Sequence, residues 1–249
     1  MIEAVDGIEL ARFGEGQGAP IALLHEGLGS VGMWRDFPER LAQAAGREVI
    51  AWSRRGYGNS ESFAAPYAAD FMHREADDAV RLLDLLGIGQ AHFFGHSDGA
   101  SIALLAAARH PARVASLILA APHVFVEDKC ITAIAAAAAP ERSADLVARL
   151  ARYHRDSAAV FRQWSSIWLA PEFPRWDIQP DIAGIGCPTL LIQGEDDEYG
   201  TFDQLDAVAR ILPGAVQLRL PDCRHSPHRD QEAAVLAASA EFLKETVDV

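Results

Sequence analysis

Short apolar runs alternate along the chain with longer stretches in which apolar residues recur at helical spacing. Residues 2–5 and 8–13 flank Asp6-Gly7, a pair that favours a hairpin turn. The other predicted strands are residues 21–25, 48–52, 91–94, 114–120, 189–193 and 216–220. The predicted helices are residues 34–45, 70–86, 97–109, 202–212 and 230–245. This alternation predicts an α/β fold in which helices flank a mostly parallel central sheet.

The alternation stops after Pro122. Residues 123–184 are mostly helical in pattern, rich in alanine and aromatic residues, and contain no convincing strand. A helical insertion in an otherwise regular α/β pattern predicts a cap over the sheet. We therefore expect one core formed by residues 1–122 and 185–249, and a helical cap formed by residues 123–184.

The segment Gly95-His96-Ser97-Asp98-Gly99 fits the pattern G-x-S-x-G between a predicted strand and a predicted helix. Such a sharp turn strains the serine backbone and leaves little room beside it, which accounts for both glycines. The turn aims the hydroxyl outward and brings the first helical N–H groups next to it, where negative charge is favoured. This context predicts Ser97 as a nucleophile, whereas the simpler alternative is a helix N-cap.

These features resemble the α/β-hydrolase superfamily over nearly the whole chain. The strand at 21–25 and the following Glu26-Gly27-Leu28-Gly29 resemble its oxyanion loop. Residues 55–60, Arg-Gly-Tyr-Gly-Asn-Ser, resemble its R-G-x-G-x-S segment. The Ser-Asp-Gly part of the turn is similar to that of valacyclovirase-like hydrolases, although this likeness is too short to imply their substrate.

An oxyanion hole needs two N–H donors near the nucleophile. The first is expected to be the backbone N–H of Asp98, directly after the serine. The resemblance implies Gly27 as the second. Glu26 stands where the family commonly has a glycine, so Leu28 is an alternative donor. The Glu26 side chain is expected in solvent, with a cationic group of a substrate as the alternative partner.

The resemblance implies a histidine base in the loop after the last strand. His225 occupies that loop, and His228 three residues later is the alternative. His96 is expected to be a packing or turn residue, because adjacent residues of the turn point away from one another. Arg224 stands where a small residue often precedes the base, and it is expected to point to solvent.

The acid is expected after the strand at 189–193, where the chain reads Gly194-Glu195-Asp196-Asp197-Glu198. In the family the acid usually lies three residues after that glycine, which implies Asp197, with Asp196 as the alternative. The order serine, aspartate, histidine matches the family arrangement. The acidic run lacks the alternating ligand spacing of a calcium loop, and Asp222, His225 and His228 form no recognised zinc motif. No metal and no cofactor are expected.

A formal net charge of −13 gives no bulk attraction for nucleic acid or an anionic membrane. The first twelve residues show no pattern of a signal peptide, and the apolar runs are too short to span a membrane. Three widely spaced cysteines do not resemble a disulfide framework and favour a reducing cytoplasm. The oligomeric state is not readable from the sequence.

These residues predict a serine hydrolase that cleaves a small carboxylic ester or lactone through an acyl-enzyme. A serine at position 97 argues against dehalogenase and epoxide hydrolase chemistry, which uses aspartate there. Phe125, Trp164 and Trp168 are expected to line the pocket of a small, partly apolar substrate, although the two tryptophans could equally pack the cap. The alternatives are hydrolysis of a carbon–carbon bond in a ring-fission product by the same triad, and a silent ligand receptor.

Overall fold

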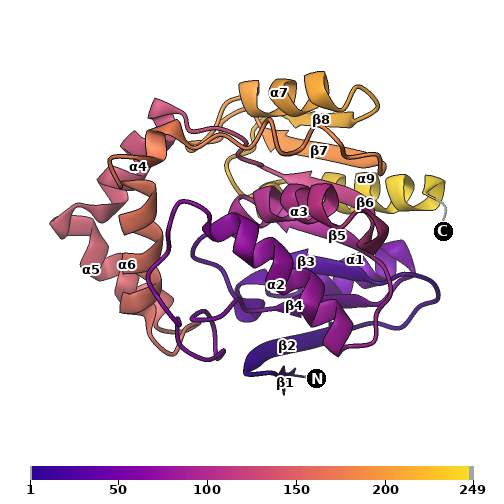
Figure 1. Ribbon diagram of the computed structural model, residues 1–249, viewed down its shortest axis with the longest axis horizontal. Coiled ribbons are helices and arrows are strands. Elements are labelled where there is room, and N and C mark those ends of the chain that lie inside the picture. The colour runs from indigo at the N-terminus through magenta and orange to yellow at the C-terminus, as the bar shows by residue number, and fades with distance from the viewer. Residues whose placement is uncertain (1, 247–249) are drawn as a thin grey trace.

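The computed structural model describes residues 2–246 of the chain, and within them eight strands form one sheet (Figure 1). The strand order is β1-β2-β4-β3-β5-β6-β7-β8. The strands are β1 Ile2–Val5, β2 Ile8–Phe13, β3 Ile21–Leu24, β4 Val49–Trp52, β5 Ala91–His96, β6 Val114–Ala120, β7 Thr189–Gly194 and β8 Val216–Leu220. The strand β2 runs antiparallel to both of its neighbours, β1 and β4, and every other pair of adjacent strands is parallel. The predicted mostly parallel sheet is therefore confirmed.

The turn between β1 and β2 has the predicted hairpin form. Val5 pairs with Ile8, and the two residues between them have positive φ angles, 51° at Asp6 and 74° at Gly7. Aspartate and glycine tolerate this left-handed backbone, which matches the right-handed twist of the flanking strands.

Helices cover both faces of the sheet. On one face, α1 Phe37–Ala45 and α9 Glu232–Glu245 pack their apolar side chains into one core cluster. On the other face, α2 Phe71–Leu85, α3 Asp98–Arg109 and α7 Asp203–Ile211 contribute to a second cluster. β3, β4, β5 and β6 contribute residues to both clusters, as expected for parallel strands covered on both sides.

Two predicted helices begin later than the sequence pattern indicates. Residues 34–45 do not form one helix, because a 3₁₀ turn at Val31–Trp34 is followed by Arg35 with φ 56°, and α1 begins only at Phe37. Residues 230–245 are interrupted at Gln231, whose φ of −131° separates the short α8 Pro227–Asp230 from α9. Periodicity alone does not reveal such breaks, because the apolar spacing continues through them.

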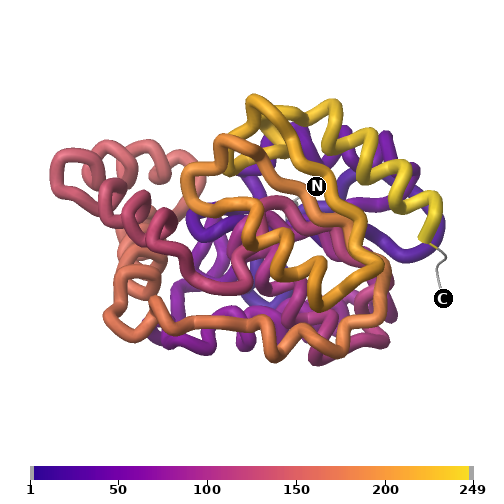
Figure 2. Tube along the Cα trace, turned by 90° about the horizontal axis from the view of Figure 1, so that it is seen from above, coloured from indigo at the N-terminus to yellow at the C-terminus, as the bar shows by residue number. Residues whose placement is uncertain are grey.

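Between β6 and β7 the chain leaves the sheet and forms α4 Asp128–Ala138, α5 Pro140–Leu150, α6 Ser157–Trp168 and a 3₁₀ turn at Phe173–Arg175. These helices stand beyond the carboxyl ends of the parallel strands, at the left of Figure 1, and Figure 2 shows the same projection from above. Asp156 caps α6 by accepting the Ala159 N–H at 2.8 Å. No helix within residues 2–246 is long and apolar enough to cross a membrane.

Candidate active site

The turn between β5 and α3 holds Ser97 in a strained conformation. Its φ and ψ are 54° and −120°, a region that residues other than glycine rarely adopt. A Cβ at Gly95 would meet the backbone of Ala100, and one at Gly99 would meet the backbone of Leu24. Both glycines are therefore required by the close approach of backbone, as the sequence pattern predicts.

Three side chains from separate segments form one hydrogen-bonded chain at the carboxyl edge of the sheet. The Ser97 hydroxyl lies 2.9 Å from Nε2 of His225, whose Nδ1 lies 2.8 Å from Oδ1 of Asp197. Because a carboxylate only accepts, Nδ1 carries the proton and Nε2 is left to accept from the hydroxyl. The structure thus brings together the three residues predicted for a triad. Of the alternatives, Asp196 is exposed and His228 is buried among aromatic rings.

The pKa shifts of Asp197 and His225 fit a histidine base that is held in place by an ionised acid. Burial disfavours the charge on Asp197, but the imidazolium form of His225 outweighs it and lowers the pKa of the carboxyl to about 2. Burial likewise disfavours the charge on His225, and the carboxylate outweighs it, so the pKa of the imidazole lies above its ordinary value. Oδ1 of Asp197 also accepts the N–H groups of Tyr199 at 2.8 Å and Gly200 at 3.2 Å. These bonds keep the carboxylate ionised and fixed.

Two further residues hold the loop that carries His225. His96, directly before the serine, lies with Nε2 2.7 Å from the backbone oxygen of His225 and therefore donates to it. Glu198 accepts the His225 N–H at 3.2 Å and pairs with Arg224, whose side chain is 70% exposed as expected. The sequence analysis expected His96 to be a packing or turn residue, and it assigned no role to Glu198, whose position beside Asp197 was the available signal.

The N–H groups predicted for an oxyanion hole differ in their availability. Among the hydrogen bonds of residues 2–246, none uses the backbone N–H of Gly27 or of Asp98. The N–H of Leu28, the alternative donor, is occupied because it donates to the Glu26 carboxylate. The expectation that the Glu26 side chain lies in solvent is corrected. The side chain is only partly exposed, and its carboxylate closes a local turn by accepting the Leu28 N–H. Gly27 and Asp98 remain the two available donors.

The loop that contains Gly27 is fixed from three directions. His25 Nδ1 lies 2.7 Å from the Glu26 carbonyl oxygen, and its Nε2 accepts the Arg54 N–H at 3.0 Å. The Arg54 guanidinium donates to the same Glu26 oxygen at 3.0 Å. From the segment between α5 and α6, His154 Nε2 lies 2.9 Å from the Leu28 oxygen. Fixed donors of this kind need no reorganisation when charge develops.

Position 27 cannot carry a side chain. A Cβ there would collide with the indole of Trp164 from α6, with Nε1 at 2.6 Å, and would lie 3.0 Å from Oδ2 of Asp98. The helical insertion therefore packs directly onto the predicted donor loop. A close approach between distant segments, rather than a positive φ, requires this glycine.

A cavity of about 170 Å³ opens above Ser97. Both Trp164 and Trp168 line it, whereas Phe125 does not; the backbone of Phe125 bridges to Asp177 and accepts from Gln204 instead. The prediction for Phe125 is corrected, because the last residue of this segment that lines the cavity before α4 is His123. The lining residues are Glu26, Gly27, Leu28, His96, Ser97, Asp98, His123, Cys130, Ile134, Trp164, Trp168, Glu198, Tyr199, His225 and Ser226.

The cavity wall is acidic. Three carboxylates line it, from Glu26, Asp98 and Glu198, and no lysine or arginine is present among its described lining residues. Burial raises the pKa of Asp98 to about 6, although Arg54, 4.0 Å away, acts in the opposite direction. An anionic substrate would therefore meet repulsion in this cavity.

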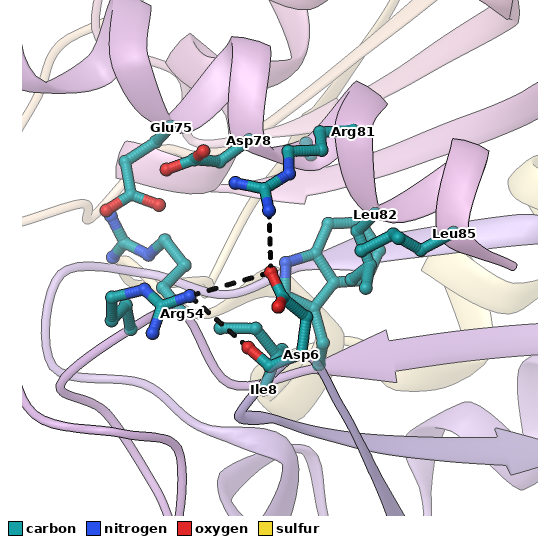
Figure 3. A pocket seen from close by; sticks show the side chains of 11 residues that line it. Asp6, Ile8, Arg54, Glu75, Asp78, Arg81, Leu82 and Leu85 are labelled. Atoms are coloured by element: carbon teal, nitrogen blue, oxygen red, sulfur yellow. Dashed lines mark hydrogen bonds and ion pairs between the residues drawn. The ribbon is translucent and has the colours of Figure 1, made fainter.

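Arg54 does not line this cavity but lines a separate recess, between the β1–β2 turn and α2 (Figure 3). There Asp6 pairs with Arg81 at 2.9 Å and with Arg55 at 3.9 Å. None of the described residues lining this recess is a serine, threonine, cysteine or histidine, so it offers no nucleophile beside a base. Within residues 2–246, no group of three or more His, Cys, Asp or Glu could hold a metal ion.

The sequence pattern of the family described as alpha/beta hydrolase fold matches residues 19–137. The serine hydrolase BPHL of Homo sapiens is 26% identical over 90% of this chain and 79% of its own length. The 2-hydroxymuconate semialdehyde hydrolase of a Pseudomonas species is 29% identical over 96% of this chain and 92% of its own. The crystal structure of an enol-lactonase from Burkholderia xenovorans superposes with a TM-score of 0.77, at 24% identity, over 98% of this chain and 100% of the other.

The fold, the serine–histidine–aspartate geometry and these likenesses define an enzyme of the hydrolase class. The chain has the α/β-hydrolase fold and is similar in sequence to serine hydrolases over most of its length, in agreement with the resemblance seen in the sequence.

Proposed function

We propose that the protein is a serine hydrolase of small carboxylic esters or lactones, with Ser97, His225 and Asp197 as its catalytic residues. The observation that carries the proposal is the continuous hydrogen-bonded chain from the Ser97 hydroxyl through both imidazole nitrogens to a buried carboxylate. That arrangement activates a hydroxyl that is otherwise a weak nucleophile.

In the proposed reaction His225 Nε2 takes the proton of the Ser97 hydroxyl while the oxygen attacks the substrate carbonyl carbon. The carbonyl oxygen becomes an oxyanion, and the N–H groups of Gly27 and Asp98 stabilise it. The tetrahedral intermediate collapses, His225 donates its proton to the leaving oxygen, and an acyl-enzyme remains. Water then gives its proton to His225, attacks the acyl carbon and releases the acid. Asp197 keeps the proton on Nδ1 throughout and stabilises the imidazolium.

The acidic cavity favours neutral or cationic substrates. Three carboxylates within a cavity of about 170 Å³ favour a small molecule without negative charge near the scissile bond. Trp164 and Trp168 supply apolar surface for its remaining part. We also propose that residues 123–184 act as a cap domain over a core of residues 1–122 and 185–249, since α6 contributes both tryptophans to the cavity.

Carbon–carbon bond hydrolysis is the second candidate. A relative similar over 96% of this chain is called a 2-hydroxymuconate semialdehyde hydrolase, and the same triad serves such chemistry. The substrates of that class are carboxylates. The absence of any lysine or arginine among the described lining residues therefore weighs against it.

The test combines covalent labelling with turnover. A fluorophosphonate should label the wild type and hydrolysis of p-nitrophenyl acetate should be measurable, whereas Ser97→Ala should show neither. Ser166→Ala, which changes an exposed serine on α6, is the control and should behave as the wild type. Labelling of folded Ser97→Ala to the wild-type extent would refute the proposal. Faster turnover of a ring-fission dienoate than of any neutral ester would favour the second candidate.

We propose a cytoplasmic location. All three cysteines, Cys130, Cys187 and Cys223, are unpaired, which suits a reducing compartment. Fractionation of the source cells with an antibody against the protein tests it, and recovery in an oxidising compartment would refute it.

A further inference from the structure

A second histidine stands beside the proposed base, and the mechanism above leaves it unused. His123 follows β6, is only 2% exposed, and lines the cavity. Its ring centroid lies 5.8 Å from that of His225 and 5.2 Å from that of Trp168, which it meets edge-on. A polar ring enclosed by the base and an indole needs a physical explanation.

The backbone of His123 is clamped in place. Ser101 Oγ, on α3, donates to the His123 carbonyl oxygen at 2.5 Å and accepts its N–H at 3.3 Å. The next residue, Val124, donates its N–H to Gln204 on α7 at 2.8 Å. Two helices therefore fix the position from which the imidazole enters the cavity, so its ring is held in place before any ligand arrives.

The imidazole itself has no hydrogen-bond partner among residues 2–246. Nδ1 is buried without one, and the bonds of His123 in this part of the chain all involve its backbone. Burial, with a further contribution from the charge on His225, lowers the pKa of His123 to about 3, so the ring is neutral at physiological pH. A neutral imidazole offers one donor and one acceptor. Nε2 also has no partner among the described residues but is not enclosed as Nδ1 is, so it is the ring nitrogen that a ligand in the cavity can reach.

The position of His123 indicates which part of a substrate it can reach. β5, which leads to Ser97, lies between β3 and β6 in the sheet. Gly27 follows β3, so the oxyanion is stabilised on the β3 side of Ser97. His123 follows β6 and therefore lies on the opposite side of Ser97, next to His225. The leaving oxygen must approach His225 to receive its proton. The alcohol part of an ester therefore lies next to His123.

We propose that His123 is a specificity residue that hydrogen-bonds a neutral hydroxyl on the alcohol part of the substrate, so that the enzyme prefers hydroxyalkyl esters to alkyl esters. The inference rests on the proposed ester hydrolysis at Ser97. It extends that function by naming the leaving-group chemistry: an ester whose alcohol carries a second hydroxyl about two carbons from the ester oxygen.

A matched pair of substrates tests this directly. 2-Hydroxyethyl butyrate and n-propyl butyrate differ only by OH in place of CH₃, and both form the same acyl-enzyme. The ratio of their kcat/KM values isolates recognition of the alcohol. One net hydrogen bond is worth about 0.5–1.5 kcal/mol, so the wild type should prefer the hydroxyethyl ester by about 2- to 13-fold. His123→Phe should reduce that ratio to about 1, whereas His123→Gln, which keeps a donor and an acceptor, should restore part of it.

Ile134→Ala, which alters the same cavity wall at an apolar position, is the control and should keep the wild-type ratio. Circular dichroism and labelling of Ser97 show whether each variant is folded, and His123→Leu, which also lacks a donor and an acceptor, serves if the phenylalanine variant is not. Equal loss of activity toward both esters in the His123 variants would overturn the inference while leaving ester hydrolysis intact. A wild type without preference would also overturn it. Absence of Ser97-dependent turnover of either ester would overturn both proposals.

Discussion

Replacing Asp197 with asparagine changes one atom beside His225 and removes one buried charge. In the wild type, Oδ1 accepts the N–H groups of Tyr199 and Gly200, and Oδ2 lies 3.2 Å from Nε2 of Gln193. The amide oxygen of the variant should therefore occupy the Oδ1 position, which two backbone donors define. Its NH₂ group then replaces Oδ2, 2.9 Å from Nδ1 of His225, where it competes with the amide oxygen, 2.8 Å from the same nitrogen, and so populates the tautomer that protonates Nε2. That tautomer cannot accept the serine proton.

The size of the effect can be bracketed. The pKa of Asp197 lies at about 2 rather than 3.8 although burial acts in the opposite direction, so its partners stabilise the carboxylate by on the order of 2 kcal/mol net. Loss of a stabilisation of this order costs roughly 10- to 100-fold in kcat/KM. The wrong tautomer adds to this, and in the serine protease template the same substitution costs about 10⁴ in kcat. We expect a loss between these values.

The assay is kcat/KM for a p-nitrophenyl ester as a function of pH. Asp196→Asn makes the same chemical change at the neighbouring exposed residue, and it should keep nearly full activity. The residual activity of Asp197→Asn should persist to lower pH, because burial without the carboxylate lowers the pKa of His225. If both variants kept more than half of the wild-type activity, the assignment of the acid would be wrong. If Asp196→Asn alone lost activity, the neighbouring residue would be the acid.

Three other predictions follow from the same structure. Activity should rise with pH and reach half its maximum above pH 6.5, because His225 must be neutral to act as a base and its pKa is raised. A midpoint below pH 6 in a pH–rate profile would contradict this. Gly27→Ala should lower kcat by about 10- to 100-fold with the fold intact, since the added Cβ collides with Trp164 and displaces the donor loop, whereas Gly184→Ala, with open space around it, should be neutral in the same assay. Glu9→Leu should lower the free energy of unfolding in urea by about 1–3 kcal/mol, since it removes the acceptor of the buried Ser53 hydroxyl and of two donors of Asn59, and Glu9→Gln should cost less; equal stability of the two variants would refute this.

The sequence predicted the sheet, the hairpin and the serine turn because each follows from local chemistry. Short apolar runs bounded by turn residues favour strands in such a pattern, and Asp6-Gly7 fits the turn it forms. Glycines 95 and 99 report a steric constraint that the structure shows directly. Ser97 was predicted from this turn and its context, whereas Asp197 and His225 followed from the position and chain order that the family resemblance implies.

The remaining features depend on contacts between segments distant in sequence. Phe125 was predicted to line the cavity because it is aromatic and begins the insertion, but its neighbours in space, not its type, decide where it lies. His123 and His96 carry no local signal, since nine histidines are indistinguishable by type until the fold brings two of them beside His225. The occupation of the Leu28 N–H by Glu26 likewise appears only in three dimensions.

The excursion between β6 and β7 begins and ends on neighbouring strands, with Leu117 of one paired to Thr189 of the other. Because its two ends lie on neighbouring strands, we expect the segment that contains α4 to α6 to be replaceable by segments of other lengths without a change in the sheet. One contact limits such a replacement, because the indole of Trp164 packs directly against Gly27. A replacement segment would need an aromatic side chain at the same place. Attempts to change the substrate range by exchanging this segment should therefore keep an indole against Gly27.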